Sequence, residues 1–253
     1  MSKFRYCLVV PHYNHYEALE KFLPKLSSIG LPCVVVDDGS QGQQLLALES
    51  LIANKDGFVL VEHKENRGKG AAMMTGAKKA RELGYTHILQ IDADGQHEVN
   101  DVKLFLKYST DHPQQIISGA PVFSSDAPKA RVYGRKVTDF WVALETLCLN
   151  FKDSLCGFRI YPLDQLEQVM AKYSLGNRMD FDTEVLVKSV WQGSQVHFIP
   201  TKVRYIENNV SHFHYIKDNL SLIYLHTRLM LGMLIRLPKL LFWRLQGHGA
   251  SSN

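Results

Sequence analysis

Two aspartates one residue apart are the most chemically suggestive feature of this 253-residue sequence. Asp92 and Asp94 come directly after the apolar run from His87 to Ile91, and Gln96 follows two residues later. Side chains at i and i+2 of an extended segment project to the same side, so the three could approach one ion. Carboxylate and amide oxygens are the ligands that hard divalent cations prefer. A solvated turn rich in Asp and Gly would look the same, so the motif must be weighed with its neighbours.

A second acidic pair occupies the corresponding place after an earlier apolar run. Asp37 and Asp38 follow Val34 to Val36, where a carboxylate can accept hydrogen bonds from a ribose hydroxyl or a base N–H. The plainer explanation of this pair is an Asp-Gly turn that caps a helix. Further candidates follow the first apolar run in the same way: Pro11, Tyr13 and Asn14.

An alternation of short apolar runs and amphipathic stretches predicts the scaffold that positions these motifs. It indicates an α/β fold with a mostly parallel central sheet flanked by helices. Ligands bind at the carboxyl ends of the strands in such sheets, where this sequence has its polar motifs. The predicted strands are Tyr6 to Val10, Cys33 to Val36, Phe58 to Val61, His87 to Ile91, Gln115 to Ser118 and Val196 to Val203. The predicted helices are Tyr16 to Ile29, Gly70 to Leu83, Ala130 to Leu149 and Asp182 to Trp191.

The C-terminal segment differs from the rest of the chain in charge. Residues 202 to 253 contain seven Lys or Arg and two Asp or Glu, whereas the remainder contains 22 basic and 23 acidic residues. Polar residues at helical spacing predict an amphipathic helix from Lys217 to Leu245, which Pro238 kinks or ends. Its charges are too many for a membrane-spanning helix, so we expect it to lie on an anionic membrane surface, to pack on the domain or to form a homodimer interface. We divide the chain into a domain at 1–210 and a tail at 211–253.

The composition argues against several classes of protein. An apolar fraction of 45% is typical of a globular protein, and the N-terminus lacks the apolar run of a signal peptide. We therefore expect a cytoplasmic protein, or one peripheral on the inner face of the cytoplasmic membrane. The four cysteines lack metal-ligand spacing. No basic cluster with stacking aromatic residues is present, which argues against nucleic acid as a partner.

In their order and spacing, the motifs resemble those of the family 2 glycosyltransferases of the GT-A fold, over roughly Tyr6 to Val203. Within that family the sequence looks closest to the branch that acts on dolichyl and polyprenyl phosphates. Three motifs carry this likeness: Asn66-Arg67-Gly68-Lys69-Gly70-Ala71-Ala72, Asp92-Ala93-Asp94-Gly95-Gln96-His97 and Asp153-Ser154-Leu155-Cys156-Gly157-Phe158-Arg159. The resemblance implies an inverting, metal-dependent hexosyltransferase that uses a UDP- or GDP-sugar as its donor.

The resemblance also implies roles for individual residues. Lys69 and Asp92 would bind the donor diphosphate, and His212 is a further candidate metal ligand. The implied ligands of Mg²⁺ or Mn²⁺ are Asp92, Asp94 and Gln96. The implied nucleoside contacts are Pro11, Tyr13, Asn14, Asp37 and Asp38. The glycines from Asn66 to Gly70 lack the spacing of a phosphate-binding P-loop, and a tight turn into the following helix explains them equally well.

The nature of the acceptor decides which other residues matter. A lipid phosphate is already anionic and would be held by arginines, for which Arg131, Arg135 and Arg159 are the candidates. A hydroxyl needs a general base, for which Asp153 and Asp182 are the candidates, and Arg159 joins them as a catalytic candidate. Asp153 could instead position Arg159, and Asp182 could instead cap a helix. We expect a lipid-linked acceptor such as a polyprenyl phosphate. The alternatives are a hydroxyl of a glycan or lipid-like metabolite in cell-envelope biosynthesis, and a non-catalytic nucleotide-sugar-binding protein.

Overall fold

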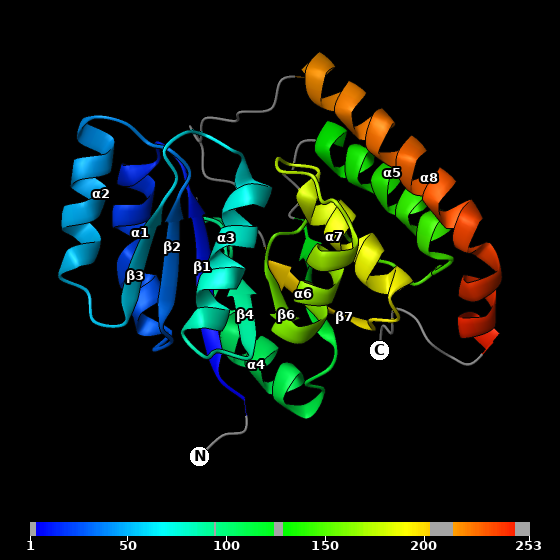
Figure 1. Cartoon of the computed structure of the whole chain (residues 1–253), viewed down its shortest axis with the longest axis horizontal. Helices are drawn as coiled ribbons and strands as arrows, with labels where there is room; N and C mark the ends of the chain where they lie inside the picture. Colours follow the sequence, from blue (N-terminus) through cyan, green and yellow to red (C-terminus); the bar gives the residue numbers. More distant parts are fainter. Residues whose placement is uncertain (1–3, 94, 124–128, 203–214, 246–253) are drawn as a thin grey trace.

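A computed structural model describes residues 4–93, 95–123, 129–202 and 215–245, with the backbone alone at 129–131 and 215–220. Seven strands form one sheet in the order β3-β2-β1-β4-β6-β5-β7 (Figure 1). They are β1 (Tyr6–His12), β2 (Cys33–Asp37), β3 (Phe58–Glu62), β4 (His87–Gln90), β5 (Ile116–Val122), β6 (Arg159–Pro162) and β7 (Val196–Lys202). β6 runs antiparallel to β4 and β5, and the other neighbouring strands are parallel. The prediction of a mostly parallel sheet is confirmed.

Helices cover both faces of this sheet (Figure 1). One face carries α1 (Tyr16–Ser28), α2 (Gln43–Ala53) and α4 (Val102–Asp111), with a 3₁₀ turn at Val99–Asp101 before α4. The other face carries α3 (Lys69–Glu82), α6 (Leu163–Lys172) and α7 (Phe181–Trp191). A further pair, α5 (Lys129–Thr146) and α8 (Tyr215–Leu245), packs against α7 from outside. The predicted α/β architecture with a C-terminal helix is therefore confirmed.

The central strands are apolar throughout because they are covered on both faces. In β1, Cys7 and Val9 face the cluster that contains α3, whereas Leu8 and Val10 face the cluster that contains α1. All of these side chains are fully buried. A strand buried on both faces has no polar alternation, which explains why short continuous apolar runs predicted these strands well.

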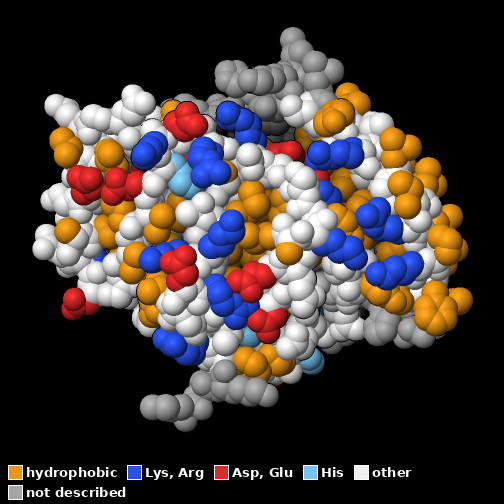
Figure 2. Space-filling view, viewed as in Figure 1, with side chains coloured by type: hydrophobic (Ala, Val, Ile, Leu, Met, Phe, Trp, Pro, Cys, Tyr) orange, Lys and Arg blue, Asp and Glu red, His pale blue; other side chains and the backbone are white. Residues whose placement is uncertain are grey.

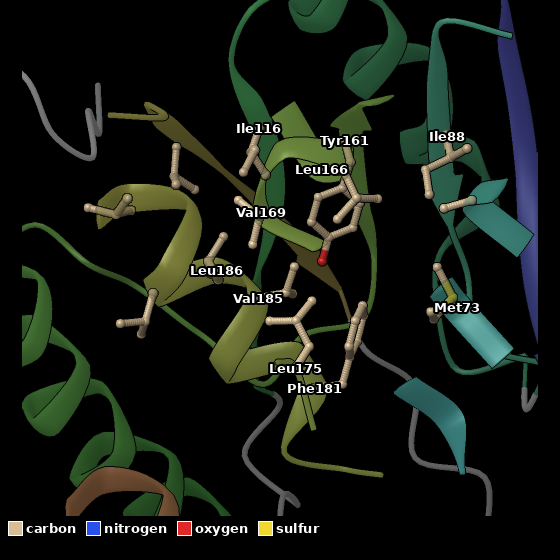
Figure 3. Packing of buried hydrophobic residues seen from close by; sticks show 14 of the residues in the cluster. Met73, Ile88, Ile116, Tyr161, Leu166, Val169, Leu175, Phe181, Val185 and Leu186 are labelled. Atoms are coloured by element: carbon tan, nitrogen blue, oxygen red, sulfur yellow. The ribbon is translucent and has the colours of Figure 1, made fainter. Parts of the chain in front are cut away.

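The core under α6 and α7 fixes the position of the start of α7. Figure 3 shows Tyr161 of β6 and Val169 of α6 lying with Phe181 and Val185 of α7 in one buried cluster. Phe181 is the first residue of α7 and is almost fully buried. Its neighbour Asp182 is therefore held at a fixed place beside the sheet.

α6 and β6 are missing from the sequence-based prediction, and α2 and α4 were covered only by the general alternation of apolar runs and amphipathic stretches, without bounds of their own. β6 has only four residues and begins with the buried side chain of Arg159, so it has no apolar run to mark it. The elements that we did predict begin and end within a few residues of their observed bounds, apart from Val203, which lies outside the described residues.

α8 continues past Pro238 to Leu245, so Pro238 does not end the helix. Pro238 lies on an exposed side, where water can bond the carbonyl group that loses its N–H partner. Within the described part of the chain, no helix combines the length and the apolarity needed to cross a membrane.

Candidate active site

Polar side chains gather at one edge of the sheet, beyond the carboxyl ends of β1, β2 and β4. β1 ends at His12, which is paired in register with Asp37 at the end of β2. Asp92 follows the last residue of β4 by two positions. The motifs that the sequence places after separate strands thus face a common edge, as parallel topology requires.

Lys69, the first residue of α3, lies between two carboxylates at this edge. Its Nζ is 2.8 Å from Oδ1 of Asp92 and donates a 2.8 Å hydrogen bond to Oδ2 of Asp182. Gln90 of β4 donates from Nε2 to the other oxygen of Asp182, also over 2.8 Å. Burial acts to lower the pKa of Lys69, but the two carboxylates outweigh it and hold that pKa above its usual range. The ammonium is therefore charged at any physiological pH.

Asp92 is correspondingly held as a carboxylate. Burial acts to raise its pKa, but Lys69 and His97 outweigh burial, and the pKa lies well below its usual range. Nε2 of His97 is 3.7 Å from Oδ2 of Asp92, and the His97 ring stacks on Phe158 with centroids 5.2 Å apart. An ionised carboxylate is the form that binds metal ions.

The residues present fit a hard divalent cation. Asp92 supplies an ionised oxygen ligand, and Gln96 supplies an amide oxygen in the same segment. Asp94 and His212, the other predicted ligands, lie outside the described residues. In the described ranges no three His, Cys, Asp or Glu side chains are grouped closely enough to hold a metal. A site here would therefore combine Asp92 with Asp94 and Gln96.

At Gly157 the backbone of the Asp153–Arg159 segment lies against the side chains of Asp92, Lys69 and Gln90. A Cβ at Gly157 would lie 2.8 Å from Oδ2 of Asp92, 2.9 Å from Nζ of Lys69 and 3.0 Å from Nε2 of Gln90. Only glycine permits so close a backbone approach. Neither Gln90 nor this role of Gly157 was predicted. The signal for Gln90 was a polar residue at the end of an otherwise apolar strand, and the sequence marked Gly157 only as part of a motif.

The glycines before α3 serve a close contact between loops. Gly68 has a φ of +99°, and a Cβ on Gly68 or Gly70 would overlap the carbonyl oxygens of Asn177 and Gly176. The backbone N–H of Ala71 also donates to the carbonyl of Asn177 over 3.1 Å. These glycines therefore let the loop pack against residues 176–177 and set the position of Lys69, in line with the tight-turn explanation.

Asp37 is fully buried, and most of its hydrogen-bonding capacity is used inside the protein. Its oxygens bond Nδ1 of His12 at 2.8 Å, the hydroxyl of Ser40 at 2.6 Å and the Ser40 backbone N–H at 2.8 Å. Burial acts to raise the pKa of Asp37, but these hydrogen bonds outweigh it and lower the pKa. His12 was not predicted, and its buried Nε2 has no hydrogen-bond partner among the described residues.

Asp38 organises the loop that carries Lys69. It accepts hydrogen bonds from the backbone N–H groups of Arg67 and Gly68, at 3.0 and 2.7 Å, and bonds Nδ1 of His63 at 2.7 Å. A carboxylate has about four acceptor positions, and hydrogen bonds within the protein occupy about three of them on each of these two side chains. Both acids thus contribute more to the protein's own hydrogen bonding than the sequence suggested.

The residues after β1 are more accessible. Pro11 is partly buried in β1, and the Tyr13 ring is exposed at the end of that strand. Asn14 adopts a left-handed conformation with a φ of 50°, and its N–H donates to the Ser40 hydroxyl over 2.8 Å. These three residues surround the same edge as the acidic pair.

Arg159 has a different role from the one that the sequence predicted. Its side chain is fully buried, and Nε donates to the hydroxyl of Ser118 at 2.9 Å. Nη1 donates to the Tyr161 hydroxyl and to the Asp182 carbonyl, and Nη2 donates to the Ser154 carbonyl, over 2.6 to 3.1 Å. Arg159 ties β5, β6 and α7 together, and we do not place it in the acceptor site or among the catalytic residues.

Arg135 and Asp153 form a pair beside Gly157. Nη1 of Arg135 donates to Oδ2 of Asp153 over 2.7 Å. Oδ1 of Asp153 accepts from the N–H groups of Leu155 and Cys156 at 2.9 and 2.6 Å, so Asp153 shapes the turn rather than positioning Arg159. The side chain of Arg131 lies outside the described residues.

Asp139 of α5 is a further acid in this region that the sequence did not single out. Burial, together with the charge of Asp153, raises the pKa of Asp139 to about 7. A carboxyl with such a pKa exchanges its proton near neutral pH.

Comparison with known proteins identifies the family. Residues 7–168 match Glycosyl transferase family 2, and the chain belongs to this family. The UDP-N-acetylglucosamine–dolichyl-phosphate N-acetylglucosaminyltransferase of Methanococcus voltae is 23% identical over 81% of this chain and 87% of its own length. The polyprenol monophosphomannose synthase of Mycolicibacterium smegmatis is 25% identical over 65% of this chain and 64% of its own length.

Solved structures share the fold. Glucosyl-3-phosphoglycerate synthase from Mycobacterium tuberculosis, in complex with UDP, has a TM-score of 0.62 at 12% identity, over 91% of this chain and 80% of its own. A mannosyltransferase from Pyrobaculum calidifontis, in complex with GDP-Man and Mn²⁺, has a TM-score of 0.57 at 17% identity, over 82% of this chain and 59% of its own. The GT-A fold predicted from the sequence is confirmed.

Proposed function

We propose that this family 2 glycosyltransferase moves a sugar from a UDP- or GDP-sugar to a lipid phosphate of the polyprenyl or dolichyl type, with inversion at the anomeric carbon. The observation that carries the proposal is the fixed ammonium of Lys69, held between Asp92 and Asp182 at the carboxyl edge of the sheet. Relatives whose names specify dolichyl phosphate and polyprenol support the class of acceptor.

The donor half of the site is built to receive a nucleoside diphosphate. Asp92, Asp94 and Gln96 would hold Mg²⁺ or Mn²⁺, and the bound cation would neutralise the charge on the departing diphosphate. Lys69 adds a second positive charge whose position is set before the donor binds, because two carboxylates fix its Nζ. Tyr13, whose ring is exposed at this edge, would contact the nucleoside.

The acceptor half favours a phosphate over a hydroxyl. Both oxygens of Asp182 accept hydrogen bonds, from Lys69 and Gln90, and both oxygens of Asp153 are likewise engaged. A carboxylate held by a cation is a poor general base. A lipid phosphate needs no deprotonation, and Arg135 offers a partly exposed guanidinium to hold it.

Transfer to a hydroxyl is the second candidate function, and Asp139 is the observation that favours it. A carboxyl with a pKa of about 7 is matched to general base catalysis at neutral pH. Replacing Asp139 with Asn would then abolish transfer to a hydroxyl acceptor, whereas transfer to a phosphate would continue.

Donor binding is tested by thermal unfolding in the presence of UDP-, GDP- and dTDP-sugars, with and without Mn²⁺. A ligand that binds only the native state raises Tm by mass action. We expect one nucleotide-sugar to raise Tm in a Mn²⁺-dependent way, and Asp92→Asn and Lys69→Met to remove the effect. Asp56→Asn, in the exposed turn before β3, is the matched control and should respond as the parent does. No shift with any nucleotide-sugar would leave a protein without a working donor site.

The acceptor is tested with a radiolabelled donor and two acceptors that differ by one group, a polyprenyl phosphate and the corresponding polyprenol. The proposal predicts labelled lipid from the phosphate alone. Labelled lipid from the polyprenol, lost in Asp139→Asn, would establish the hydroxyl function instead.

A lipid acceptor also requires contact with a bilayer, and we propose that the contact is peripheral. The C-terminal helix, which the sequence predicts to lie on a membrane, is the first candidate for it.

A further inference from the structure

α5 and α8 concentrate the exposed hydrophobic surface of the protein. Of the twenty large hydrophobic side chains exposed among the described residues, five lie on α5 and eight on α8. The five on α5 are Tyr133, Val137, Phe140, Trp141 and Leu144, and the eight on α8 are Ile223, Tyr224, Leu231, Leu234, Ile235, Leu241, Phe242 and Leu245. Surface hydrophobic residues scattered singly need no explanation, but a cluster of this kind marks an interaction surface.

The eight residues of α8 form one stripe along the helix. At 100° per residue they span about a third of the helix circumference. The opposite side of the helix is buried in the domain, with Leu225, Leu229, Met233 and Leu240 in the same core cluster as the sheet. α8 is therefore apolar on its inner face for packing, and it has a second apolar stripe that faces outward without a partner in the described structure.

The stripe on α8 continues onto α5. The Trp141 ring of α5 stacks on His226 of α8 with centroids 6.3 Å apart, and His226 bonds Glu145 of α5 at 2.8 Å. Farther along, Arg244 donates to the carbonyl of Thr146 over 2.6 Å. These contacts keep the two helices side by side (Figure 1), and we call their exposed hydrophobic side chains together the α5–α8 face.

Positive charge borders the α5–α8 face. Residues 221–245 contain four basic residues and no Asp or Glu, and two of the four, Arg228 and Lys239, have exposed side chains. Arg228 also pairs with Glu184, whereas Arg236 and Arg244 are partly buried against Trp191 and the Thr146 carbonyl. Figure 2 shows hydrophobic side chains along the outer edge of the molecule over α8, with Lys and Arg side chains beside them. Lys239 is exposed and lies over the Trp243 ring, 4.1 Å from its centroid. An apolar strip with a basic margin is complementary to an anionic bilayer surface.

A second copy of the chain suits this surface less well. In a symmetric dimer the same patch meets itself, so the exposed basic side chains of residues 221–245 would approach their copies, and that segment has no Asp or Glu to pair with them. An anionic membrane supplies the missing negative charge. Tyr133, Trp141 and Tyr224 also have the amphipathic rings that favour the level of the lipid headgroups.

We propose that the α5–α8 face is a membrane-docking surface for anionic lipid, to which α5 and α8 contribute jointly. The inference extends the proposed function, because α5 also carries Arg135, the arginine that we place in the acceptor site. Docking would hold that helix, and hence Arg135, at the bilayer from which a lipid phosphate is taken. The surface itself is argued from exposure and charge and does not depend on the identity of the acceptor.

Vesicle sedimentation of the full chain tests the proposal, with phosphatidylcholine vesicles compared with phosphatidylcholine–phosphatidylglycerol vesicles. Ile235→Glu and Phe140→Glu each place one charge on the face, at side chains that are 80% and 61% exposed, so neither should disturb the fold. Leu46→Glu is the matched control, 65% exposed on α2 at the far end of the molecule (Figure 1). We expect the parent and Leu46→Glu to bind the anionic vesicles, and each variant on the face to bind about tenfold more weakly.

Several outcomes would overturn the proposal. Binding that Ile235→Glu weakens and Phe140→Glu leaves unchanged would restrict the surface to α8. If all variants bind equally, or if the parent does not bind anionic vesicles, the α5–α8 face is not a membrane-docking surface. A dimer that both substitutions dissociate, with no vesicle binding, would assign the face to a second copy. The nucleotide-sugar shift in Tm is measured on the same variants, so loss of membrane binding is distinguished from failure of the donor site.

Discussion

A side chain added at Gly157 would meet the charged groups of the site. The three atoms nearest to an added Cβ are the ends of the Asp92, Lys69 and Gln90 side chains, which can move without unfolding the protein. Displacing them by a few tenths of an ångström would alter the position of the Lys69 ammonium and the Asp92 oxygens together. Function should therefore suffer more than stability.

We predict that Gly157→Ala lowers kcat/KM for sugar transfer by about a hundredfold, because small misplacements of charged groups in a site have large effects on rate. The free energy of unfolding should change by no more than about 1 kcal/mol. Urea denaturation and a transfer assay on the same preparation measure both. Gly134→Ala on α5, where an added Cβ meets open space, is the control and should transfer at the parental rate. Full activity of Gly157→Ala would show that the close approach has no functional role.

Asp139 gives the protein a distinctive dependence of stability on pH. Its pKa is raised from 3.8 to about 7, so the native state holds a proton that the unfolded chain has released above about pH 4. Between about pH 4 and pH 7 unfolding thus releases a proton, and the contribution of Asp139 to stability falls as pH rises. Above about pH 7 the folded protein bears the full cost of a carboxylate beside Asp153.

Asp139→Asn should remove this loss. We expect the variant to match the parent near pH 4 and to exceed its free energy of unfolding by about 1–2 kcal/mol above pH 7, a reduced value because water screens a partly exposed carboxyl. Urea denaturation across this pH range measures the difference, and Asp56→Asn should show no such trend. If the free energies of unfolding of Asp139→Asn and the parent differ by the same amount at every pH, the raised pKa of Asp139 is contradicted.

The sequence identified the residues of the site better than it identified their partners. Asp92 and Lys69 were predicted from local motifs, and they lie in contact with each other at the carboxyl edge of the sheet. The bond between Lys69 and Asp182 joins residues 113 positions apart, which no local pattern reports. For the same reason Asp153 and Asp182 resembled available bases in the sequence, although distant side chains occupy both.

At the scale of the element, the packing of α8 against α7 restricts the side chains that fit at the position of Gly232. A Cβ there would lie 2.6 Å from Cη2 of Trp191, a buried ring whose Nε1 donates to the carbonyl of Glu145 over 2.8 Å. Arg236 of α8 covers the same ring, with its guanidinium carbon 4.7 Å from the centroid. The indole is thus fixed on several sides and cannot move away.

We predict opposite effects of the same substitution on two helices. Gly232→Ala gains about 1 kcal/mol in helix propensity but overpacks Trp191 at a cost of about 1–3 kcal/mol, so the free energy of unfolding should fall. Gly134→Ala gains the propensity without the clash and should stabilise the protein by up to about 1 kcal/mol. Urea denaturation of the two variants measures both signs. Stabilisation by Gly232→Ala would mean that α8 can shift away from α7.

Elements were predicted where burial leaves a simple pattern. β1 and β2 are covered on both faces and therefore appear as apolar runs. β6 was missed because the buried guanidinium of Arg159 interrupts its apolar character. The C-terminal helix was predicted from its spacing, but spacing could not tell which apolar side faces inward, since α8 is apolar on two sides.

For the molecule as a whole, the open question is whether α8 unfolds with the domain or by itself. Its inward side chains belong to the cluster that includes Val9 of β1 and Trp191 of α7. Arg228 of α8 also pairs with the fully buried carboxylate of Glu184, which bonds the backbone N–H of Gly176 beside the loop of Lys69. Contacts of this extent predict one cooperative unit, with α8 contributing to the stability of the active-site edge.

Leu229→Ala tests this cooperativity. Truncating a buried leucine should lower the free energy of unfolding of the whole protein by about 2–5 kcal/mol, whereas Ile235→Ala on the outward stripe should change it by less than about 0.5 kcal/mol. Far-UV circular dichroism and tryptophan fluorescence should then trace a single coincident transition in urea that moves as one in Leu229→Ala. An early, separate loss of helix in that variant, with the main transition unmoved, would instead establish α8 as an independent tail, and the boundary predicted at residue 210 would then separate two folding units.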